Sequence, residues 1–235
     1  QCRLVALCDR DTARLEQARG SLGEVSVTTQ LDELLARRDI EAVSLCLPDN
    51  AHLQAMLRCV EAGKHVLIEK PLADKYADAA RIVEALRDYP KKVMVGHLLR
   101  FDPRYSGAWR MIRSGEIGEV VYARVRRTSD IRGPRYYGGA ASLAFHLAVH
   151  DVDLLNWLIG SRVRRLYAAA GRKVLGELQI DDCLLSVLHF ADGSLAQLEH
   201  SCHCQHQAHD DFFHDIPVRS ERLFRSIVYT PSVRA

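Results

Sequence analysis

Short, almost wholly apolar segments recur along the first hundred residues, and one helix-like stretch separates each from the next. We predict buried strands over residues 3–8, 25–28, 42–47, 65–68 and 93–96. Apolar residues recur at helical spacing over 11–22, around Leu34 and Leu35, over 53–62 and over 74–88. Thr29 and Asp32 resemble a capping box for the second of these helices, and Asp74 can cap the last. Strands that are apolar on both faces and joined by single helices indicate a parallel, doubly wound α/β sheet.

The second half of the chain shows a different pattern. Asp102 followed by Pro103 predicts the start of a helix that Gly115 ends. Strands are predicted over 120–128, 163–170, 183–190 and 194–200, and a long helix over 142–159 that ends at Gly160. The turn residues Asp192 and Gly193 predict a hairpin, which favours an α+β domain with a mostly antiparallel sheet. We therefore divide the chain into a dinucleotide-binding, Rossmann-like domain over 1–98 and a substrate and oligomerisation domain over 99–235.

Net charge, apolar run length and cysteine content indicate which partners and which cellular compartment to expect. Lys and Arg number 32 and Asp and Glu number 30, so a net charge of +2 offers no basic field for a nucleic acid. No apolar run approaches the ~18 residues of a membrane span, and no signal peptide opens the chain. The seven cysteines are odd in number and lie mostly in apolar runs, which predicts reduced thiols in a cytoplasmic protein.

Doubly wound sheets bind ligands beyond the carboxyl ends of their strands. The residues that follow the predicted strands are Asp9, Pro48, Glu69, Lys70 and His97. Lys70 is the sharpest of these, because the following Pro71 restricts the backbone and burial would lower the pKa of its ammonium group. Such a lysine suits proton exchange with a substrate hydroxyl, and the alternative is a surface lysine in a proline turn.

The first predicted strand ends at Asp9, next to Arg10. A carboxylate at this position accepts hydrogen bonds from the adenosine ribose of NAD and repels the 2′-phosphate of NADP, whereas a guanidinium would hold that phosphate. The alternative is a helix-capping aspartate. No Gly-x-Gly-x-x-Gly sequence is present. Either the chain is not a dinucleotide binder, or the phosphate loop has been lost ahead of the first strand, which we favour.

His146 and His150 lie four residues apart on the predicted helix, with Asp153 and Trp157 on the same face. This spacing places two imidazoles where they share a proton or bind a metal, and the alternative is packing in the core. A second histidine-rich segment comprises His200, Cys202, His203, Cys204, His206, His209 and His214. It lacks the spacing of structural zinc sites, so a metal site and a frayed or truncated end both stay open.

Six stretches together resemble the Gfo/Idh/MocA family of oxidoreductases, named after glucose–fructose oxidoreductase, inositol dehydrogenase and rhizopine catabolism. They are residues 5–11, 47–52, 62–73, 96–103, 115–118 and 149–155, in the order in which the family has them. The resemblance implies a dehydrogenase that uses NAD or NADP, with NAD slightly favoured, and acts on a secondary alcohol of a sugar or an inositol-like polyol. It also leads us to expect a homo-oligomer formed through the sheet of the second domain.

The resemblance assigns roles to individual residues. Lys70 matches the catalytic lysine that hydrogen-bonds the reacting hydroxyl, and His150 matches the general acid/base. Pro48, Asn50 and His52 match the loop that lines the cofactor, with Glu69 beside the nicotinamide. Arg100 matches a position at the mouth of the substrate pocket.

The sequence departs from the family pattern in three ways. The phosphate loop is missing, His146 replaces an aspartate four residues before the catalytic histidine, and the closing strands are absent beyond about His200. The first and third lead us to expect a fragment that is incomplete at both ends. The second makes His146 a candidate catalytic and substrate-contacting residue. The alternatives to an active enzyme are an inactive fragment, a relative that binds a nucleotide or sugar without catalysis, and a metal-binding module built on the tail.

Overall fold

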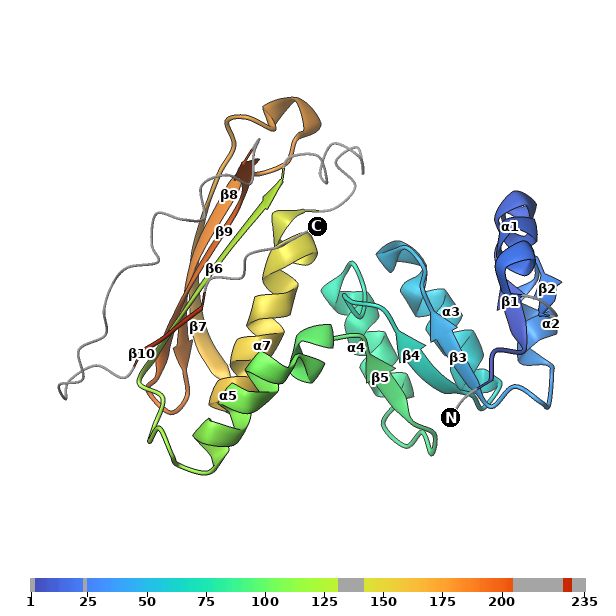
Figure 1. The fold of residues 1–235 in the computed structure, drawn as a ribbon, viewed down its shortest axis with the longest axis horizontal. Coiled ribbons are helices and arrows are strands. Elements are labelled where there is room, and N and C mark those ends of the chain that lie inside the picture. Colours follow the sequence, from blue (N-terminus) through green and yellow to red (C-terminus); the bar gives the residue numbers. More distant parts are fainter. Residues whose placement is uncertain (1–2, 23–24, 131–141, 205–225, 230–235) are drawn as a thin grey trace. The chain divides into compact units, whose positions relative to one another are not determined.

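A computed structural model of the protein describes residues 3–22, 25–130, 142–204 and 226–229 (Figure 1). The chain divides into two compact units, residues 1–96 and residues 97–235. Each unit has its own strands and its own buried apolar clusters, so each is described by itself.

The first unit alternates strands and helices, as the sequence predicts. Its elements are β1 (Ala6–Cys8), α1 (Thr12–Leu22), β2 (Ser26–Thr28), α2 (Leu31–Leu35), β3 (Ala42–Leu45), a 3₁₀ turn (Asp49–Ala51), α3 (His52–Glu61), β4 (His65–Ile68), α4 (Tyr76–Ala85) and β5 (Val93–Val95). Every strand pair is parallel: β1 with β2 in one sheet, and β3–β4–β5 in another. The prediction of a parallel Rossmann-type sheet is confirmed.

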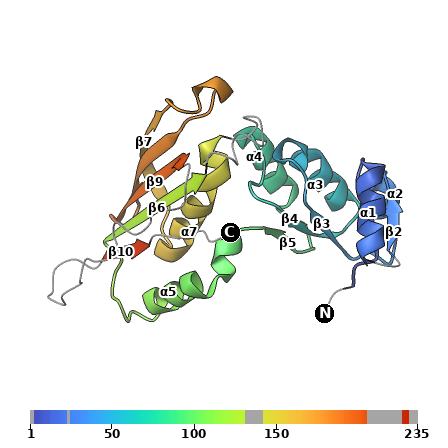
Figure 2. The same ribbon diagram turned by 45° about the horizontal axis from the view of Figure 1, so that its top comes forward.

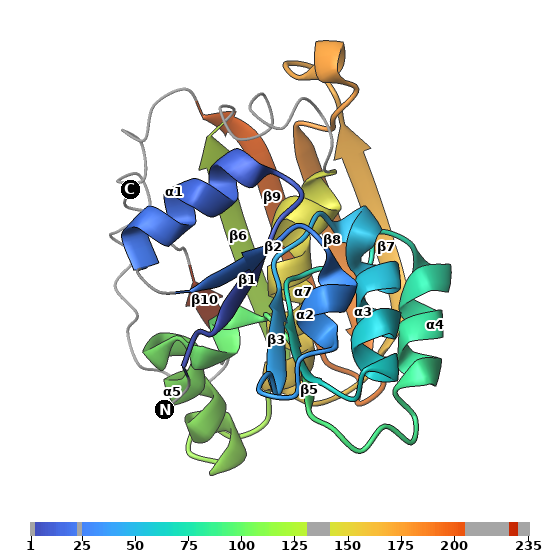
Figure 3. The ribbon, with the colours of Figure 1, turned by 90° about the vertical axis from the view of Figure 1, so that its right-hand side faces the viewer.

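One apolar core serves both sheets of the first unit. Val43, Leu45, Val66 and Ile68 are buried in the same cluster as Met56 of α3, and residues of β1 pack against it. Helices α3 and α4 lie side by side against β3–β5 (Figure 3). In β3 and β4, however, the buried residues alternate with exposed ones. Only one face of these two strands is therefore fully buried, and the apolar Ala42 and Leu67 lie exposed on the other face, although the sequence predicts strands buried on both faces.

Two predicted helix caps in the first unit are wrong. At α2 the hydroxyl of Thr28, not Thr29, accepts the N–H of Gln30 at 3.1 Å. Helix α4 begins at Tyr76 after Lys75, and Asp74 does not cap it. In both places the predicted polar residue lies one position away from the N-cap residue of the helix. Sequence alone does not fix a helix boundary to one residue.

The second unit is built around one larger sheet. Its elements are a 3₁₀ turn (Leu98–Phe101), α5 (Pro103–Arg113), β6 (Tyr122–Asp130), a π-helical turn (Ala144–Ala148), α7 (Val149–Ile159), β7 (Val163–Gly171), a 3₁₀ turn (Gly176–Leu178), β8 (Cys183–Phe190), β9 (Leu195–Cys204) and β10 (Ser226–Tyr229). Asp102 caps α5 as predicted, since its carboxylate accepts the N–H of Arg104 at 2.9 Å. Gly160 ends α7 in the left-handed conformation, at φ 75°.

The strand order is β10–β6–β9–β8–β7, and the sheet is mixed. The hairpins β7–β8 and β8–β9 are antiparallel, whereas β6 pairs in parallel with both β9 and β10. The expected antiparallel character therefore holds for half of the sheet, because β6 runs beside β9 in the same direction. The strand pattern also does not end near His200: β9 continues to Cys204, since Thr128 and Asp130 of β6 pair with its last residues.

Helix α7 covers one face of this sheet (Figure 2). Leu155 packs against Val125, Leu188 and Leu198 from three strands. Helix α5 packs on α7, and there the rings of Trp109 and Trp157 stack with centroids 5.4 Å apart and planes 6° apart. Helix α7 is therefore packed against the sheet on one side and against α5 on another.

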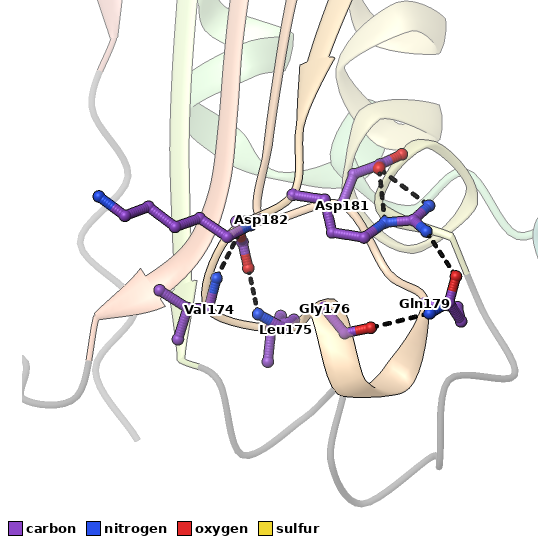
Figure 4. A network of polar contacts seen from close by, with 8 residues as sticks. Val174, Leu175, Gly176, Gln179, Asp181 and Asp182 are labelled. Carbon is purple, nitrogen blue, oxygen red and sulfur yellow. Dashed lines mark hydrogen bonds and ion pairs between the residues drawn. The ribbon is translucent and has the colours of Figure 1, made fainter.

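The connection between β7 and β8 is held by one buried carboxylate (Figure 4). Asp182 accepts the backbone N–H groups of Lys173, Val174 at 2.7 Å and Leu175 at 2.6 Å. Next to it, Arg172 bonds the side chains of Gln179 and Asp181. These bonds satisfy the backbone of an irregular loop, so the network stabilises the fold.

Among the described residues, none of the helices combines the length and the apolarity that crossing a membrane requires.

Candidate active site

Strands β3, β4 and β5 end at one edge of their sheet. Leu45, Ile68 and Val95 are paired across the three strands. Glu69 N–H donates to the carbonyl of Leu45 at 3.0 Å, and Gly96 N–H donates to that of Ile68 at 2.7 Å. The residues that follow these strands, Glu69 and Lys70 among them, are therefore brought to a common edge, which is where parallel sheets bind ligands.

Lys70 lies at this edge with its side chain half-buried. Burial lowers the pKa of its ammonium group, and the negative charges of Glu69 and Asp49 oppose that shift. The peptide bond to the buried Pro71 is cis. A lysine whose charge is partly desolvated next to two carboxylates is suited to donate and recover a proton.

The exposed side chain of Glu69 folds back over the end of β5. Its Oε2 accepts the N–H of Lys70 at 3.2 Å, and a Cβ placed on Gly96 would lie 3.4 Å from the same oxygen. A glycine at position 96 therefore leaves room for the carboxylate at the strand ends. This arrangement keeps an acceptor exposed beside Lys70.

Asp9 follows β1, and its side chain is 40% exposed. One carboxylate oxygen accepts the N–H of Asp11 at 2.9 Å, and Arg14 lies 3.9 Å from the other. The exposed Arg10 is adjacent. Asp9 therefore holds the turn before α1 without capping that helix, since Asp11 accepts the N–H groups of Ala13 and Arg14, and Asp9 leaves carboxylate surface open to a ribose hydroxyl.

The three loop residues assigned to the cofactor differ in exposure. Pro48 and Asn50 are exposed, in the turn between β3 and α3. His52 is fully buried, with Nδ1 at 2.9 Å from the carbonyl of Pro71 and Nε2 at 3.0 Å from that of Leu47. Its ring therefore joins this turn to the loop that follows Lys70.

The polar strand ends of the first unit fit the adenosine ribose and nicotinamide ends of a dinucleotide. Asp9 supplies an exposed carboxylate for ribose hydroxyls, and Gly96 leaves an uncrowded edge beside Glu69. Hydrogen-bond acceptors at strand ends are the groups that such cofactors use in parallel sheets.

In the second unit, Asp153 of α7 gathers two of the predicted residues. Its carboxylate accepts two hydrogen bonds from Arg100, at 2.8 and 2.5 Å, and lies 3.7 Å from His97 Nε2. The guanidinium of Arg100 also lies over the ring of Trp157, 5.9 Å from its centroid. Arg100 is therefore held in place by α7, with 41% of its side chain exposed.

His146 and His150 lie on one helical segment, but that segment is not α-helical throughout as predicted. His146 is in the π-helical turn Ala144–Ala148, and His150 is in the first turn of α7. A π turn holds more residues than an α turn, so the two histidines stay about one turn apart. Both side chains are half-buried, and π turns inside helices often mark functional sites.

A buried triad next to His150 was not predicted. Asp151 is fully buried and accepts hydrogen bonds from Arg127 of β6 at 2.8 and 2.6 Å and from Nε2 of His200 of β9 at 2.9 Å. Burial raises the pKa of Asp151, but its bonds to Arg127 and His200 outweigh that effect and lower it. The partners are distant in sequence, and no local pattern marks them.

Within the described parts of the chain, no three His, Cys, Asp or Glu side chains gather as ligands for a metal ion. Of the predicted tail cluster, His200 is a buried partner of Asp151, and Cys202 is buried. His206, His209 and His214 lie outside the described residues, as do the side chains of His203 and Cys204.

Two family models match the chain, one in each half. Residues 1–97 match the model of the oxidoreductase family with an NAD-binding Rossmann fold, and residues 105–215 match that of the GFO/IDH/MocA C-terminal domain. The two models together account for most of the chain.

Individual relatives are similar over much of this chain. The 4-carboxy-2-hydroxymuconate-6-semialdehyde dehydrogenase of a Sphingobium species is 32% identical over 68% of this chain and 52% of its own length. Inositol 2-dehydrogenase of Rhizobium meliloti is 31% identical over 85% of this chain and 61% of its own length. The structure of a putative myo-inositol dehydrogenase from Sinorhizobium meliloti has a TM-score of 0.78 at 29% identity, over 86% of this chain and 62% of that one. The chain spans between half and about three-fifths of these relatives.

Proposed function

The chain belongs to the GFO/IDH/MocA family of oxidoreductases, and from this membership we propose that it acts as an NAD(P)-dependent dehydrogenase or reductase. The substrate would be a secondary alcohol of a sugar, an inositol-like polyol or a related compound. The observation that carries the proposal is Lys70, half-buried at the strand ends with a lowered pKa beside two carboxylates.

The nicotinamide, when bound, supplies the acceptor or donor for hydride. The protein's own residues then have to orient the alcohol and handle its proton. Lys70 donates a hydrogen bond to the hydroxyl oxygen and stabilises the negative charge that develops there. The lowered pKa of Lys70 supports this role, because it brings the ammonium group closer to the pH at which it exchanges a proton.

His150 takes the hydroxyl proton in oxidation and returns it in reduction. Its place in the first turn of α7 supports this assignment, because the adjacent Asp151 is anchored to two strands by Arg127 and His200. An imidazole on a fixed backbone loses little entropy when it meets the substrate. His146, about one turn away, contacts the substrate.

We propose NAD as the preferred cofactor. The open carboxylate of Asp9 at the end of β1 supports this choice, because it would repel the 2′-phosphate of NADP. The neighbouring Arg10 favours the opposite choice. The two cofactors therefore have to be compared directly.

A substrate panel tests the proposal. The purified protein, expressed from its whole reading frame, is incubated with NAD or NADP and with inositols, hexoses, sugar acids, nucleotide sugars and hydroxylated semialdehydes, while nicotinamide reduction is followed by absorbance. Turnover that Lys70→Met abolishes is the expected result. Binding of cofactor without turnover of any compound would instead favour a non-catalytic nucleotide- or sugar-binding relative.

For assembly we propose a homo-oligomer formed through the sheet of the second unit. The face of β8 that points away from α7 carries Leu185 and Val187, which are 48% and 37% exposed, and Tyr167 pairs with Val187 from β7. Exposed apolar groups in register on one face are typical of interfaces. Sedimentation should show an oligomer that Val187→Lys dissociates, and a monomeric wild type would contradict the proposal.

A further inference from the structure

The ring of His52 lies between two backbone carbonyl groups. Nδ1 is 2.9 Å from the oxygen of Pro71, and Nε2 is 3.0 Å from the oxygen of Leu47. The side chain is fully buried. Both distances are within the range of N–H···O hydrogen bonds.

A carbonyl oxygen accepts hydrogen bonds and does not donate them. A neutral imidazole has only one N–H. In either tautomer the other nitrogen would point its lone pair at a carbonyl oxygen within van der Waals distance, where the two lone pairs repel each other. A doubly protonated ring donates to both oxygens. The geometry around His52 therefore favours the charged ring, because a buried polar atom without a partner is costly.

The two segments that contact this ring, residues 47–51 and 69–75, carry the ionisable side chains of Asp49, Glu69, Lys70, Asp74 and Lys75. Three of these five are carboxylates, so the two segments together carry a net negative charge. On the same helix as His52, Arg58 is already paired with Asp32.

His65, in the same unit, makes the opposite kind of contact. Its Nδ1 accepts the backbone N–H of Lys92 at 2.9 Å, so that nitrogen is bare. His65 begins β4 and His52 begins α3. Both nitrogens of His52 contact carbonyl oxygens, whereas Nδ1 of His65 accepts a backbone N–H. His65 is therefore an internal reference for the protonation of His52.

We propose that His52 is a positioning residue that carries both ring protons and ties the turn after β3 to the loop after β4. One of its two acceptors is Pro71, the residue that follows Lys70, so the tie fixes the backbone from which the Lys70 ammonium group extends. This role rests on the function proposed for Lys70, whereas the protonation of the ring does not depend on it.

The protonation state is measured by nitrogen NMR of the protein labelled in its histidine rings, at neutral pH. We expect the chemical shifts of both His52 nitrogens to be those of protonated nitrogens, and one bare nitrogen in His65. His52→Gln and His65→Gln assign the two sets of signals. A bare nitrogen in His52 of the wild-type protein would overturn the proposal. The two variants serve only to assign the signals, and the measurement needs no enzyme activity.

The positioning role is measured on Lys70. The pH dependence of its reductive methylation is followed by peptide mass spectrometry, with the exposed Lys91 in the same digest as reference. In His52→Gln we expect the titration midpoint of Lys70 to move up toward that of an ordinary lysine, because the released loop no longer buries it. His65→Gln should leave the midpoint unchanged.

Kinetics complete the test. If Lys70 is displaced by a fraction of an ångström or more, kcat in His52→Gln falls about 10- to 100-fold while the KM for cofactor changes by less than about threefold. An unchanged Lys70 titration together with an unchanged kcat would overturn the positioning role. An inactive wild type with a doubly protonated His52 would count against the proposed enzyme function and leave the protonated tie in place.

Discussion

Asp151 accepts two hydrogen bonds from Arg127, at 2.8 and 2.6 Å, and so joins the first turn of α7 to β6 across 24 positions of sequence. Both charges are buried, at 0% and 12% side-chain exposure. A buried pair of this kind is costly to break, because the remaining partner keeps its charge without compensation. The helix that carries His150 is therefore fixed to the sheet by an ionic contact one residue away.

Asp151→Asn should lower the free energy of unfolding by about 3–5 kcal/mol, since it leaves the guanidinium of Arg127 buried without a counter-charge. Urea denaturation followed by far-ultraviolet circular dichroism measures this change. Asp181→Asn is the matched control, because its ion pair with Arg172 is exposed and should be worth ~1 kcal/mol or less. Equal losses in the two variants would contradict the account.

The same pair predicts a pH dependence. The pKa of Asp151 is lower in the folded protein than in the unfolded chain, so the unfolded chain binds the proton more readily. The stabilisation is present above the unfolded pKa of about 3.9 and is lost as the pH falls through the folded value. The stability difference between wild type and Asp151→Asn should shrink in acid, and a gap that stays constant down to the lowest accessible pH would argue against it.

Lys70→Met should abolish most turnover without a loss of stability. Removal of a group that stabilises the reacting oxygen costs about 100-fold or more in kcat. Burial lowers the pKa of Lys70, so its charge opposes folding near neutral pH, and methionine removes that penalty. Steady-state kinetics and the thermal midpoint are the measurements, and near-normal turnover would exclude the catalytic role.

Asp9→Asn tests cofactor choice. The amide keeps an oxygen that accepts the N–H of Asp11, so the turn after β1 is preserved while the negative charge is lost. We expect the ratio of kcat/KM for NAD to that for NADP to fall by about tenfold, since a repulsive charge near the 2′-phosphate is removed. A wild type that already prefers NADP strongly would show that Arg10 determines the choice.

His146→Asp restores the residue that the family pattern has at this position. An aspartate about one turn from His150 would favour the protonated imidazole, so the acidic limb of the pH–rate profile should move to higher pH. The ranking of substrates should change as well. Superimposable profiles and an unchanged ranking would mean that His146 packs without contacting the substrate.

Much of the fold follows from local sequence. The ends of β4 and β8 agree with the prediction to the residue, because charged or turn residues flank each apolar run. Asp102 and Pro103 mark the start of α5 for the same local reason. Where a polar residue next to the true cap could serve equally well, as at Asp74, the prediction was wrong by one position.

The partnerships of the candidate site could not be predicted in this way. His200 belongs by sequence to a histidine-rich tail, yet in the fold it is a buried partner of Asp151, 49 positions away. The sheet brings them together through the parallel pairing of β6 and β9, in which Arg127 lies opposite His200. Such contacts depend on strand order, which local patterns do not encode.

The stacked rings of Trp109 and Trp157 are the two tryptophans of the whole chain, and both lie in the second unit. Tryptophan fluorescence therefore reports on the unit that carries α5 and α7, and the first unit does not contribute to it. A guanidinium lies over each indole ring, that of Arg113 over Trp109 and that of Arg100 over Trp157. The molecule thus contains its own optical probe, through which melting of the helix that bears His150 can be followed separately from melting of the parallel sheets that bear Lys70.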